Sequence, residues 1–184
     1  MSSHYRIYLA GPEVFFPESE HQAIVAEKKR LLEAHGFEGV DPLDTDLEFP
    51  EQESKPDRGL RIYRANRELM DSCHGIIANL TPFRGISADP GTVFEVGYMI
   101  GQGKAAFGFT MEPRHYRLRA GGDERDALGH SIEDFDLSDN LMIECGITES
   151  GGRLFTARAP GEHSHFSSEL FADCIKPLAT QLLR

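Results

Sequence analysis

A three-layer α/β fold built on a central parallel sheet is predicted by two features of the sequence. Short segments rich in β-forming residues alternate along the chain with longer segments in which apolar residues recur at helical spacing. Strands separated by helices pair in parallel, because each helix supplies a crossover connection, and such crossovers are right-handed. A chain of 184 residues is long enough to bury one substantial core, so we expect a single domain over residues 1–184.

Four segments have the composition of strands. Residues 5–10 (YRIYLA) alternate in character and are followed by Gly11-Pro12, which ends the strand. A short apolar run, residues 75–80, leads directly into a polar loop. The predicted strands are residues 5–10, 37–40, 75–80 and 104–110.

Helical spacing of apolar residues recurs between and after these strands. In the first such segment, Ser19 has the side chain of an N-cap, and Gly36 closes the helix after His35. The predicted helices are residues 19–35, 58–73, a segment from Pro90-Gly91-Thr92 to about Gln102, and 166–183. The sequence predicts an acidic surface loop at residues 44–57. Residues 112–130 form a long excursion that we interpret as a flap, and apolar content returns at residues 131–147.

Composition excludes several classes of function. The net charge of −11 argues against general binding to nucleic-acid backbones, which needs a basic face, and suits a neutral or cationic small molecule. No stretch approaches the ~20 apolar residues that span a bilayer, and the first residues do not have the pattern of a signal peptide. Three separated cysteines are typical of reduced thiols, so we expect a cytoplasmic location.

Residues 81–103 have the features of a functional site. A predicted strand runs into a polar loop that holds Arg84 and Asp89, and the loop turns into a helix that holds Glu95. In α/β proteins ligands bind outside the carboxyl ends of the parallel strands. Two acids six residues apart at such a strand end therefore predict a site.

The two acids suit glycosyl chemistry. A carboxylate at Glu95, near a helix N-terminus, would be kept ionised by the macrodipole and could attack an electrophilic sugar carbon to form a covalent intermediate. Asp89 could protonate the leaving group and later take a proton back. The structural alternatives are a capping box, in which Glu95 pairs with Thr92 as the cap, and an acid that merely closes the Asp89-Pro90-Gly91 turn.

Tyr8 is the third candidate. It lies near the carboxyl end of the first strand, on the same rim as Glu95 if the strands are parallel. A phenol in that place could hydrogen-bond the Glu95 carboxylate and set its nucleophilicity. On spacing alone, a tyrosine half-buried in the sheet is an interpretation at least as good.

Other motifs in the sequence give weaker indications of function. Gly97, Gly101 and Gly103 fall inside and after a helix, where a dinucleotide fingerprint does not occur. The run Glu162-His163-Ser164-His165 resembles a metal site but has no partner ligands nearby in sequence. The chain has no GxSxG nucleophile elbow. We therefore expect no metal and no cofactor.

Three blocks of the sequence resemble the nucleoside 2-deoxyribosyltransferase family. They are residues 8–12 (YLAGP), 77–85 (IANLTPFRG) and 89–97 (DPGTVFEVG), and residues 140–142 (NLM) resemble a later element of that family. The resemblance covers about residues 5 to 145. It implies a flavodoxin-like fold and an enzyme that transfers 2-deoxyribose from one nucleobase to another, and nucleoside salvage in the cell.

The resemblance also assigns roles to the catalytic candidates. Glu95 matches the nucleophile that attacks C1′, and Tyr8 matches the tyrosine that holds it. Asp89 matches the acid that protonates the departing base and deprotonates the incoming one.

Further positions are expected to bind the substrate. Asn66 falls where some members have an aspartate that touches the sugar. Asn140 matches an asparagine that a neighbouring subunit contributes at the sugar 5′-hydroxyl, which implies a homo-oligomer with shared active sites. Phe15 could wall the base pocket by stacking, or it could be a core or rim residue. The remaining expected substrate-binding residues are Gly11, Arg84 and Gly91.

Two other functions remain open. A hydrolase on the same fold would cleave nucleoside 5′-monophosphates with a similar glutamate, and Arg84 and Ser87 are compatible with a phosphate pocket. A non-catalytic module would bind a nucleotide-like ligand and would release no base. Residues 140–142 favour an unphosphorylated sugar, so we expect 2′-deoxynucleosides and free nucleobases as substrates.

Overall fold

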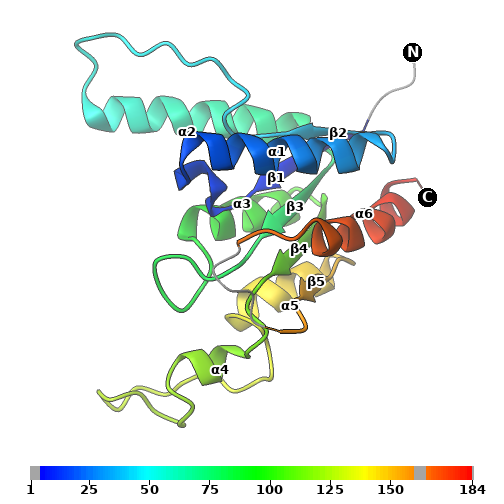
Figure 1. Ribbon diagram of the computed structural model, residues 1–184. Coiled ribbons are helices and arrows are strands. Elements are labelled where there is room, and N and C mark those ends of the chain that lie inside the picture. Colours follow the sequence, from blue (N-terminus) through cyan, green and yellow to red (C-terminus); the bar gives the residue numbers. More distant parts are fainter. Residues whose placement is uncertain (1–4, 160–164, 184) are drawn as a thin grey trace.

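The computed structural model describes residues 5–159 and 165–183. Strands and helices alternate along this part of the chain, as the apolar periodicity predicts (Figure 1). The strands are β1 (Tyr5–Ala10), β2 (Phe37–Val40), β3 (Gly75–Asn79), β4 (Ala105–Thr110) and β5 (Leu154–Thr156). The helices are η1 (Pro12–Phe15), α1 (Glu18–Glu33), α2 (Lys55–Ser72), α3 (Pro90–Gly101), α4 (Tyr116–Arg119), α5 (Leu141–Glu149) and α6 (Ser168–Leu182).

The five strands form one sheet in the order β2-β1-β3-β4-β5, and every neighbouring pair is parallel. This order is that of flavodoxin-like proteins, so the predicted fold class is confirmed. From β1 the chain passes to β2 on one side, whereas β3 lies on the other side of β1. The loops that leave β1 and β3 therefore run in opposite directions. The crevice at such a place, where the order of the strands reverses, is where proteins of this fold bind ligands.

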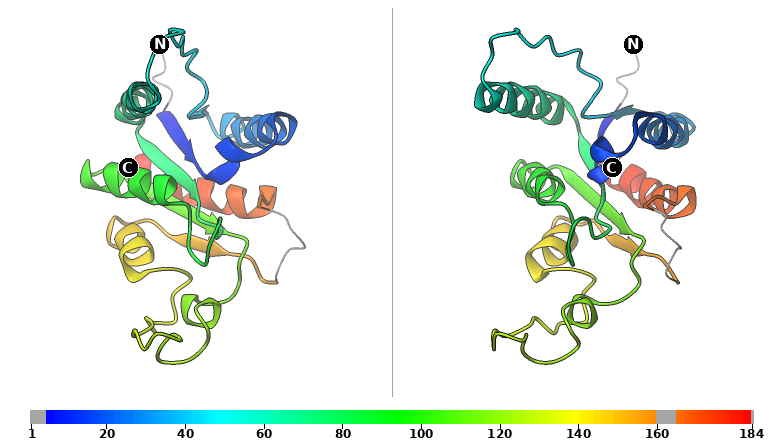
Figure 2. Two further views of the ribbon diagram at one scale, coloured as in Figure 1. Left: turned by 90° about the vertical axis from the view of Figure 1, so that its left-hand side faces the viewer. Right: turned by 60° about the vertical axis from the view of Figure 1, so that its left-hand side comes forward.

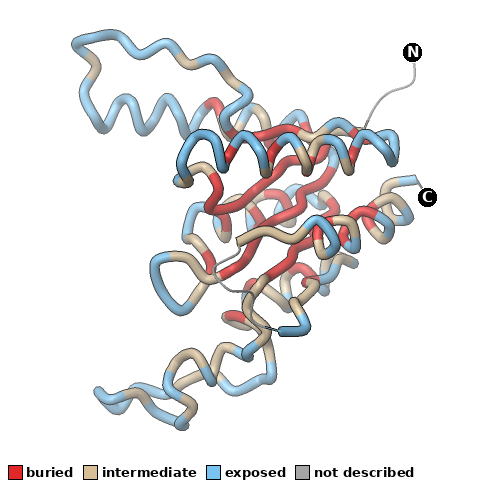
Figure 3. Tube along the Cα trace, in the orientation of Figure 1, coloured by how far each residue is buried: buried red, intermediate tan, exposed pale blue. Residues whose placement is uncertain are grey.

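Helices cover both faces of the sheet (Figure 2). On one face, buried side chains of β1 and β3 such as Tyr8 and Ile76 pack with those of α3 and α5, and Met70 of α2 joins them. On the other face, Ile7 and Phe107 pack with side chains of α1 and α6. The strands are accordingly the most deeply buried part of the chain (Figure 3).

Some element ends differ from the predictions. Helix α1 begins at Glu18, with no side-chain cap, so Ser19 is not its N-cap. The loop predicted over residues 44–57 ends at Ser54, whose hydroxyl accepts a hydrogen bond from the Asp57 amide and caps α2. Strand β5 was not predicted, because three residues are too few to show alternation, and it exists by pairing with β4.

Two segments extend beyond the sheet. Helix α2 projects past β1 with the loop of residues 41–54 arching over it (Figure 1), and residues 55–64 are all exposed. The excursion of residues 111–140, which contains α4, hangs from the β5 side of the sheet (Figure 2). In the described part of the chain, no helix combines the length and apolar character that crossing a membrane requires.

Candidate active site

A hydrogen bond joins the two residues at the centre of the site. Tyr8 lies near the end of β1 with its side chain fully buried, and its hydroxyl donates to Oε1 of Glu95 over 2.8 Å. Glu95 comes from α3, which packs over β1 and β3 on the same face of the sheet. Tyr8 is thus fully buried and has a polar partner, whereas the structural alternative drawn from its spacing was a half-buried tyrosine.

Burial raises the pKa of the Glu95 carboxyl to about 7. The nearby charges of Asp89 and Asp41 act in the same direction, whereas the hydrogen bond from Tyr8 lowers the pKa. The expectation that the helix macrodipole keeps this group ionised was wrong. Glu95 follows Pro90, the first residue of α3, by more than one turn, and the effect of the dipole falls off within the first turn.

The phenol remains the proton donor in this pair. Its burial, together with the charge of Glu95 and the hydrogen bond to it, raises the pKa of Tyr8 well above its usual range. Tyr8 therefore stays protonated over the pH range in which Glu95 ionises, and it can donate to the Glu95 carboxylate.

Asp89 is the N-cap of α3. Its Oδ2 accepts hydrogen bonds from the backbone amide of Thr92 over 3.0 Å and from the Thr92 hydroxyl over 3.2 Å. Thr92 is therefore not the cap, and the capping-box alternative for Glu95 is wrong. A Cβ atom at Gly91 would lie 3.0 Å from Asp89 Oδ2, so the absence of a side chain at Gly91 leaves room for this carboxylate.

Asp41 is a third acid at the same end of the sheet, and sequence reasoning did not select it. It follows Val40, which pairs with Tyr8, and its side chain is buried. Its Oδ1 lies 3.2 Å from Nε2 of His21, and burial raises the pKa of its carboxyl. The sequence pattern that could have identified Asp41 is an acid directly after a predicted strand, on the same rim of the sheet as Tyr8.

Phe15 and Arg84 meet at the rim of the site. The ring of Phe15 stacks on that of Phe83 with centroids 5.6 Å apart and planes 9° apart, and half of Phe15 is exposed. The guanidinium carbon of Arg84 lies 4.7 Å and 4.8 Å from the two ring centroids. Arg84 has a φ of 57°, a conformation that costs a residue with a side chain about 1–3 kcal/mol. The loops after β1 and β3 are therefore joined by a flat aromatic and cationic surface.

Packing beneath this rim leaves no room for a side chain at Gly11. A Cβ atom there would lie 1.9 Å from Oε2 of Glu13, whose side chain turns back under the loop. Oε1 of Glu13 accepts hydrogen bonds from Lys28 Nζ over 2.6 Å and from Asn79 Nδ2 over 2.9 Å, and Lys28 and Glu13 are both buried. This buried ion pair fixes the loop that carries Phe15 to α1 and β3.

In the described part of the chain, neither predicted asparagine forms a hydrogen bond with Glu95, whose carboxylate accepts from Tyr8. Asn66 lies on α2 and is half-buried. Asn140 is the N-cap of α5, where its Oδ1 accepts from the Met142 amide over 3.0 Å and its Nδ2 donates to Glu133 Oε1 over 2.6 Å. Both polar atoms of the Asn140 side chain are thus bound within its own chain.

The metal-like run of the sequence falls mostly outside the described residues, which exclude positions 162–164. His165 is described, and its ring packs against Phe16 and Phe83. In the part that the structure describes, no three His, Cys, Asp or Glu side chains are grouped to hold a metal ion.

Comparison with known proteins identifies the family. The sequence model of the nucleoside 2-deoxyribosyltransferase family matches residues 7–142, a span that includes Tyr8, Asp89 and Glu95. The chain belongs to this family. Proteins of the nucleoside 2-deoxyribosyltransferase family are enzymes that act on nucleosides.

The proteins similar to this chain include one solved 2-deoxyribosyltransferase. An uncharacterized protein of Schizosaccharomyces pombe is 35% identical over 198 residues, which cover 96% of this chain and 89% of that protein. A 2-deoxyribosyltransferase from Leishmania mexicana is 26% identical and superposes with a TM-score of 0.68, covering 94% of this chain and 97% of its own. A conserved protein from Enterococcus faecalis shares the fold, with a TM-score of 0.57 at 18% identity over 95% of this chain and 98% of its own.

Proposed function

We propose that this protein transfers 2-deoxyribose between nucleobases through a covalent deoxyribosyl intermediate on Glu95. The observation that carries the proposal is the Tyr8–Glu95 hydrogen bond, with Asp89 at the start of the same helix. A nucleophile on one side of a sugar and a proton donor on the side of the base are the two groups that glycosyl transfer needs.

In the first step, Oε2 of Glu95 attacks C1′ of the deoxyribose, because Tyr8 occupies Oε1. The C1′–O bond forms as the C1′–N bond to the base breaks, and the bonding electrons stay on the base nitrogen. The Asp89 carboxyl group gives its proton to the base, which leaves as a neutral molecule.

In the second step, a different base enters and Asp89 takes its proton. The base nitrogen then attacks C1′, and the C1′–O bond to Glu95 breaks. Glu95 is released as a carboxylate and Asp89 is again protonated, so the cycle is closed without a metal or a redox step in the proposed chemistry.

The surface formed by Phe15, Phe83 and Arg84 is the proposed base-binding wall. Stacked rings offer a flat apolar face to a nucleobase, and the partly exposed ring of Phe15 can receive it. A neutral deoxynucleoside is compatible with a protein of net charge −11, which has no basic field to attract a phosphate.

We also propose that the enzyme is a homo-oligomer. Exposed apolar side chains lie on α2, α3 and α5, and two of them, Tyr63 and Phe94, are in edge contact with ring centroids 6.2 Å apart. Exposed apolar side chains that gather on a surface indicate a protein interface. Phe94 is adjacent to Glu95 in sequence, and Met142 lies two residues from Asn140. The set is Leu60, Ile62, Tyr63, Phe94 and Met142.

A second candidate is hydrolysis of nucleoside 5′-monophosphates. The observation that favours it is Arg84, an exposed cation at the rim that, among the described residues, contacts aromatic rings and no acid. Such a guanidinium could receive a phosphate. In this reaction water, not a second base, would release the sugar from Glu95.

One experiment separates these functions. The protein is incubated with thymidine, with and without adenine, and the products are followed by chromatography; 2′-deoxyinosine with adenine covers a purine-specific enzyme. Transfer predicts deoxyadenosine and the free first base only when adenine is present. Base release that is equal without adenine would establish hydrolysis, and base release from deoxynucleoside monophosphates alone would favour the second candidate.

The Glu95→Ala variant is the decisive control, and Glu149→Ala, at an exposed position near the end of α5, is its match. We expect Glu95→Ala to abolish product formation while the folded state persists, and Glu149→Ala to retain normal rates. Near-native turnover by Glu95→Ala would rule out the nucleophile. Release of no base by the wild type from any of these substrates would favour a non-catalytic binding module.

A further inference from the structure

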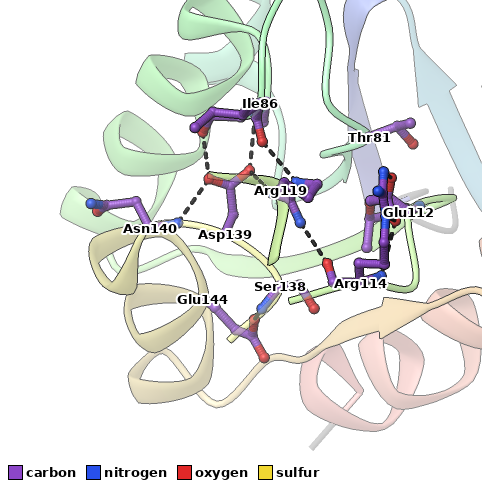
Figure 4. Close-up of polar contacts among 12 residues, drawn as sticks. Thr81, Ile86, Glu112, Arg114, Arg119, Ser138, Asp139, Asn140 and Glu144 are labelled. Atoms are coloured by element: carbon purple, nitrogen blue, oxygen red, sulfur yellow. Dashed lines mark hydrogen bonds and ion pairs between the residues drawn. The ribbon is translucent and has the colours of Figure 1, made fainter. Parts of the chain in front are cut away.

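The loop that leads into Asp89 is held by a buried carboxylate from a distant part of the chain. Asp139 directly precedes the cap of α5, and its Oδ2 accepts a hydrogen bond from the Ala88 amide over 2.9 Å (Figure 4). Its Oδ1 accepts from the Ser87 hydroxyl and, over 2.7 Å, from the Asn140 amide. Asp139 thus contacts the two residues that come immediately before Asp89.

Arg119, at the end of α4, holds the same loop from its carbonyl side. Its Nε donates to the carbonyl oxygen of Ile86 over 2.8 Å, and its Nη1 donates to the carbonyl of Arg114 over 2.7 Å. Nη2 lies 3.5 Å from Oδ2 of Asp139, which forms an ion pair whose side chains are 4% and 2% exposed. Figure 4 shows both side chains converging beside Ile86.

The pair is costly to bury, which argues for a role in geometry. Burial lowers the pKa of Arg119, and its buried Nη2 has no hydrogen-bond partner in the described part of the chain. Replacing a buried ion pair by apolar residues is often neutral or stabilising, so stability alone does not account for such a pair. What it supplies is a fixed position for the three backbone units from Ile86 to Ala88.

We propose that Arg119 and Asp139 are positioning residues that hold Asp89 in place for proton transfer to the leaving base. This inference rests on the proposed function, in which Asp89 is the acid. Within the loop, a single backbone hydrogen bond, from the Phe83 amide to the Ser87 carbonyl, defines its turn, and Ile86 is partly exposed. A displacement of 1 Å at a reacting group costs about 10²-fold in rate, so the contacts at Ser87 and Ala88 bear directly on catalysis.

The proposal also gives the excursion of residues 111–140 a function. Its helix α4 supplies Arg119 and its final residues supply Asp139, so the excursion braces the catalytic loop from outside the sheet. The contacts of Arg119 favour a fixed support over the flap predicted for residues 112–130.

The test compares leaving bases in variants of the whole chain. The substrates are 2′-deoxyuridine and 5-fluoro-2′-deoxyuridine, or, for a purine-specific enzyme, 2′-deoxyinosine and its 7-methyl derivative. In each pair the second base leaves with less need for protonation. The readout is a ratio, the kcat/KM of the second substrate of a pair divided by the kcat/KM of the first. This ratio does not depend on how much of a variant is folded.

We expect Arg119→Lys and Asp139→Asn to raise this ratio by about tenfold, in the same direction as Asp89→Asn, because a displaced acid slows mainly the poorer leaving base. The matched control is Arg117→Lys, which alters a half-exposed ion pair with Asp134 in the same excursion and should leave the ratio unchanged. In the Asp89→Asn background, Arg119→Lys should cause less than about threefold further loss, because it acts through Asp89.

Three results would overturn the proposal. The first is an unchanged ratio in both Arg119→Lys and Asp139→Asn, and the second is a loss that adds in full to that of Asp89→Asn. Either result with an active wild type would overturn the inference alone. A wild type that releases no base from any substrate would overturn the proposed function and this inference together.

Discussion

The hydroxyl of Tyr8 and Oε1 of Glu95 are 2.8 Å apart, although the two residues are separated by 87 positions in the chain. The phenol donates to a carboxylate whose pKa is about 7, so the charge of Glu95 changes within the pH range in which enzymes are assayed. Burial raises this pKa into that range, the charges of Asp89 and Asp41 raise it further, and the hydrogen bond from Tyr8 opposes them.

The first prediction concerns the pH profile. Glu95 must be ionised to attack C1′, so kcat/KM should rise with pH along an acidic limb with an apparent pKa of about 7. Below that pH the rate should fall about tenfold per pH unit. A limb near the ordinary glutamate value of 4.5 would show that Glu95 is not buried as described or is not the ionising group.

Tyr8→Phe should move this limb to higher pH. The hydrogen bond from Tyr8 stabilises the charged carboxylate, and its loss raises the pKa of Glu95. At pH 6 the variant should therefore lose more activity than at pH 9, and rates measured across this range on a single deoxynucleoside would show the difference. A loss that is equal at every pH would mean that Tyr8 does not set the ionisation of Glu95.

Asp41→Asn should move the limb in the opposite direction. The charge of Asp41 raises the pKa of Glu95, so its removal favours the ionised nucleophile at lower pH. His21, Lys28 and Asp44 act on Asp41 itself, and the asparagine keeps the acceptor for the Leu43 amide. Asp44→Asn, a change at an exposed position nearby, is the control and should leave the apparent pKa of the acidic limb unchanged. A higher apparent pKa in Asp41→Asn would contradict the prediction.

Glu95→Gln should stabilise the folded protein at neutral and alkaline pH. The folded pKa of about 7 lies above the ordinary value of 4.5, so the contribution of Glu95 to stability is fully present below pH 4.5 and is lost as pH rises through 7. Glutamine has no such loss, and above pH 7 the gain should be on the order of 3 kcal/mol. Urea unfolding at pH 4.5 and pH 8 measures it, and equal stabilities of the two proteins at pH 8 would refute it.

Lys28→Met should destabilise the protein by about 3–5 kcal/mol, because it leaves the buried Glu13 carboxylate without its partner. Addition of Glu13→Gln should restore part of that loss, since the unpaired charge is then removed. Arg30→Met, which breaks an exposed ion pair with Glu27 on the same helix, should change stability little. Denaturant unfolding of the four proteins checks the prediction, and similar losses from Lys28→Met and Arg30→Met would contradict it.

Much of the fold follows from local patterns. The strand at residues 5–10 and the helices that alternate with the strands were predictable, because side-chain periodicity is set by the element itself. The beginning of α3 at Pro90 was predicted, whereas α2 begins at Lys55, three residues before the predicted helix, because Ser54 caps it. In α3 the cap is Asp89 and not Thr92, a choice that depends on the backbone conformation of the loop before the helix.

The sequence by itself determined the parallel α/β architecture, the family and the two acids six residues apart, because each is expressed over a short stretch of chain. Tertiary structure alone decided the ionisation of Glu95, since burial and the charges of Asp89 and Asp41 act through space. It also brought Asp139 to Ser87, 52 residues away, and placed Arg119 beside them. Such contacts leave no periodic signal in the sequence, because they arise only when the sheet has brought distant loops together.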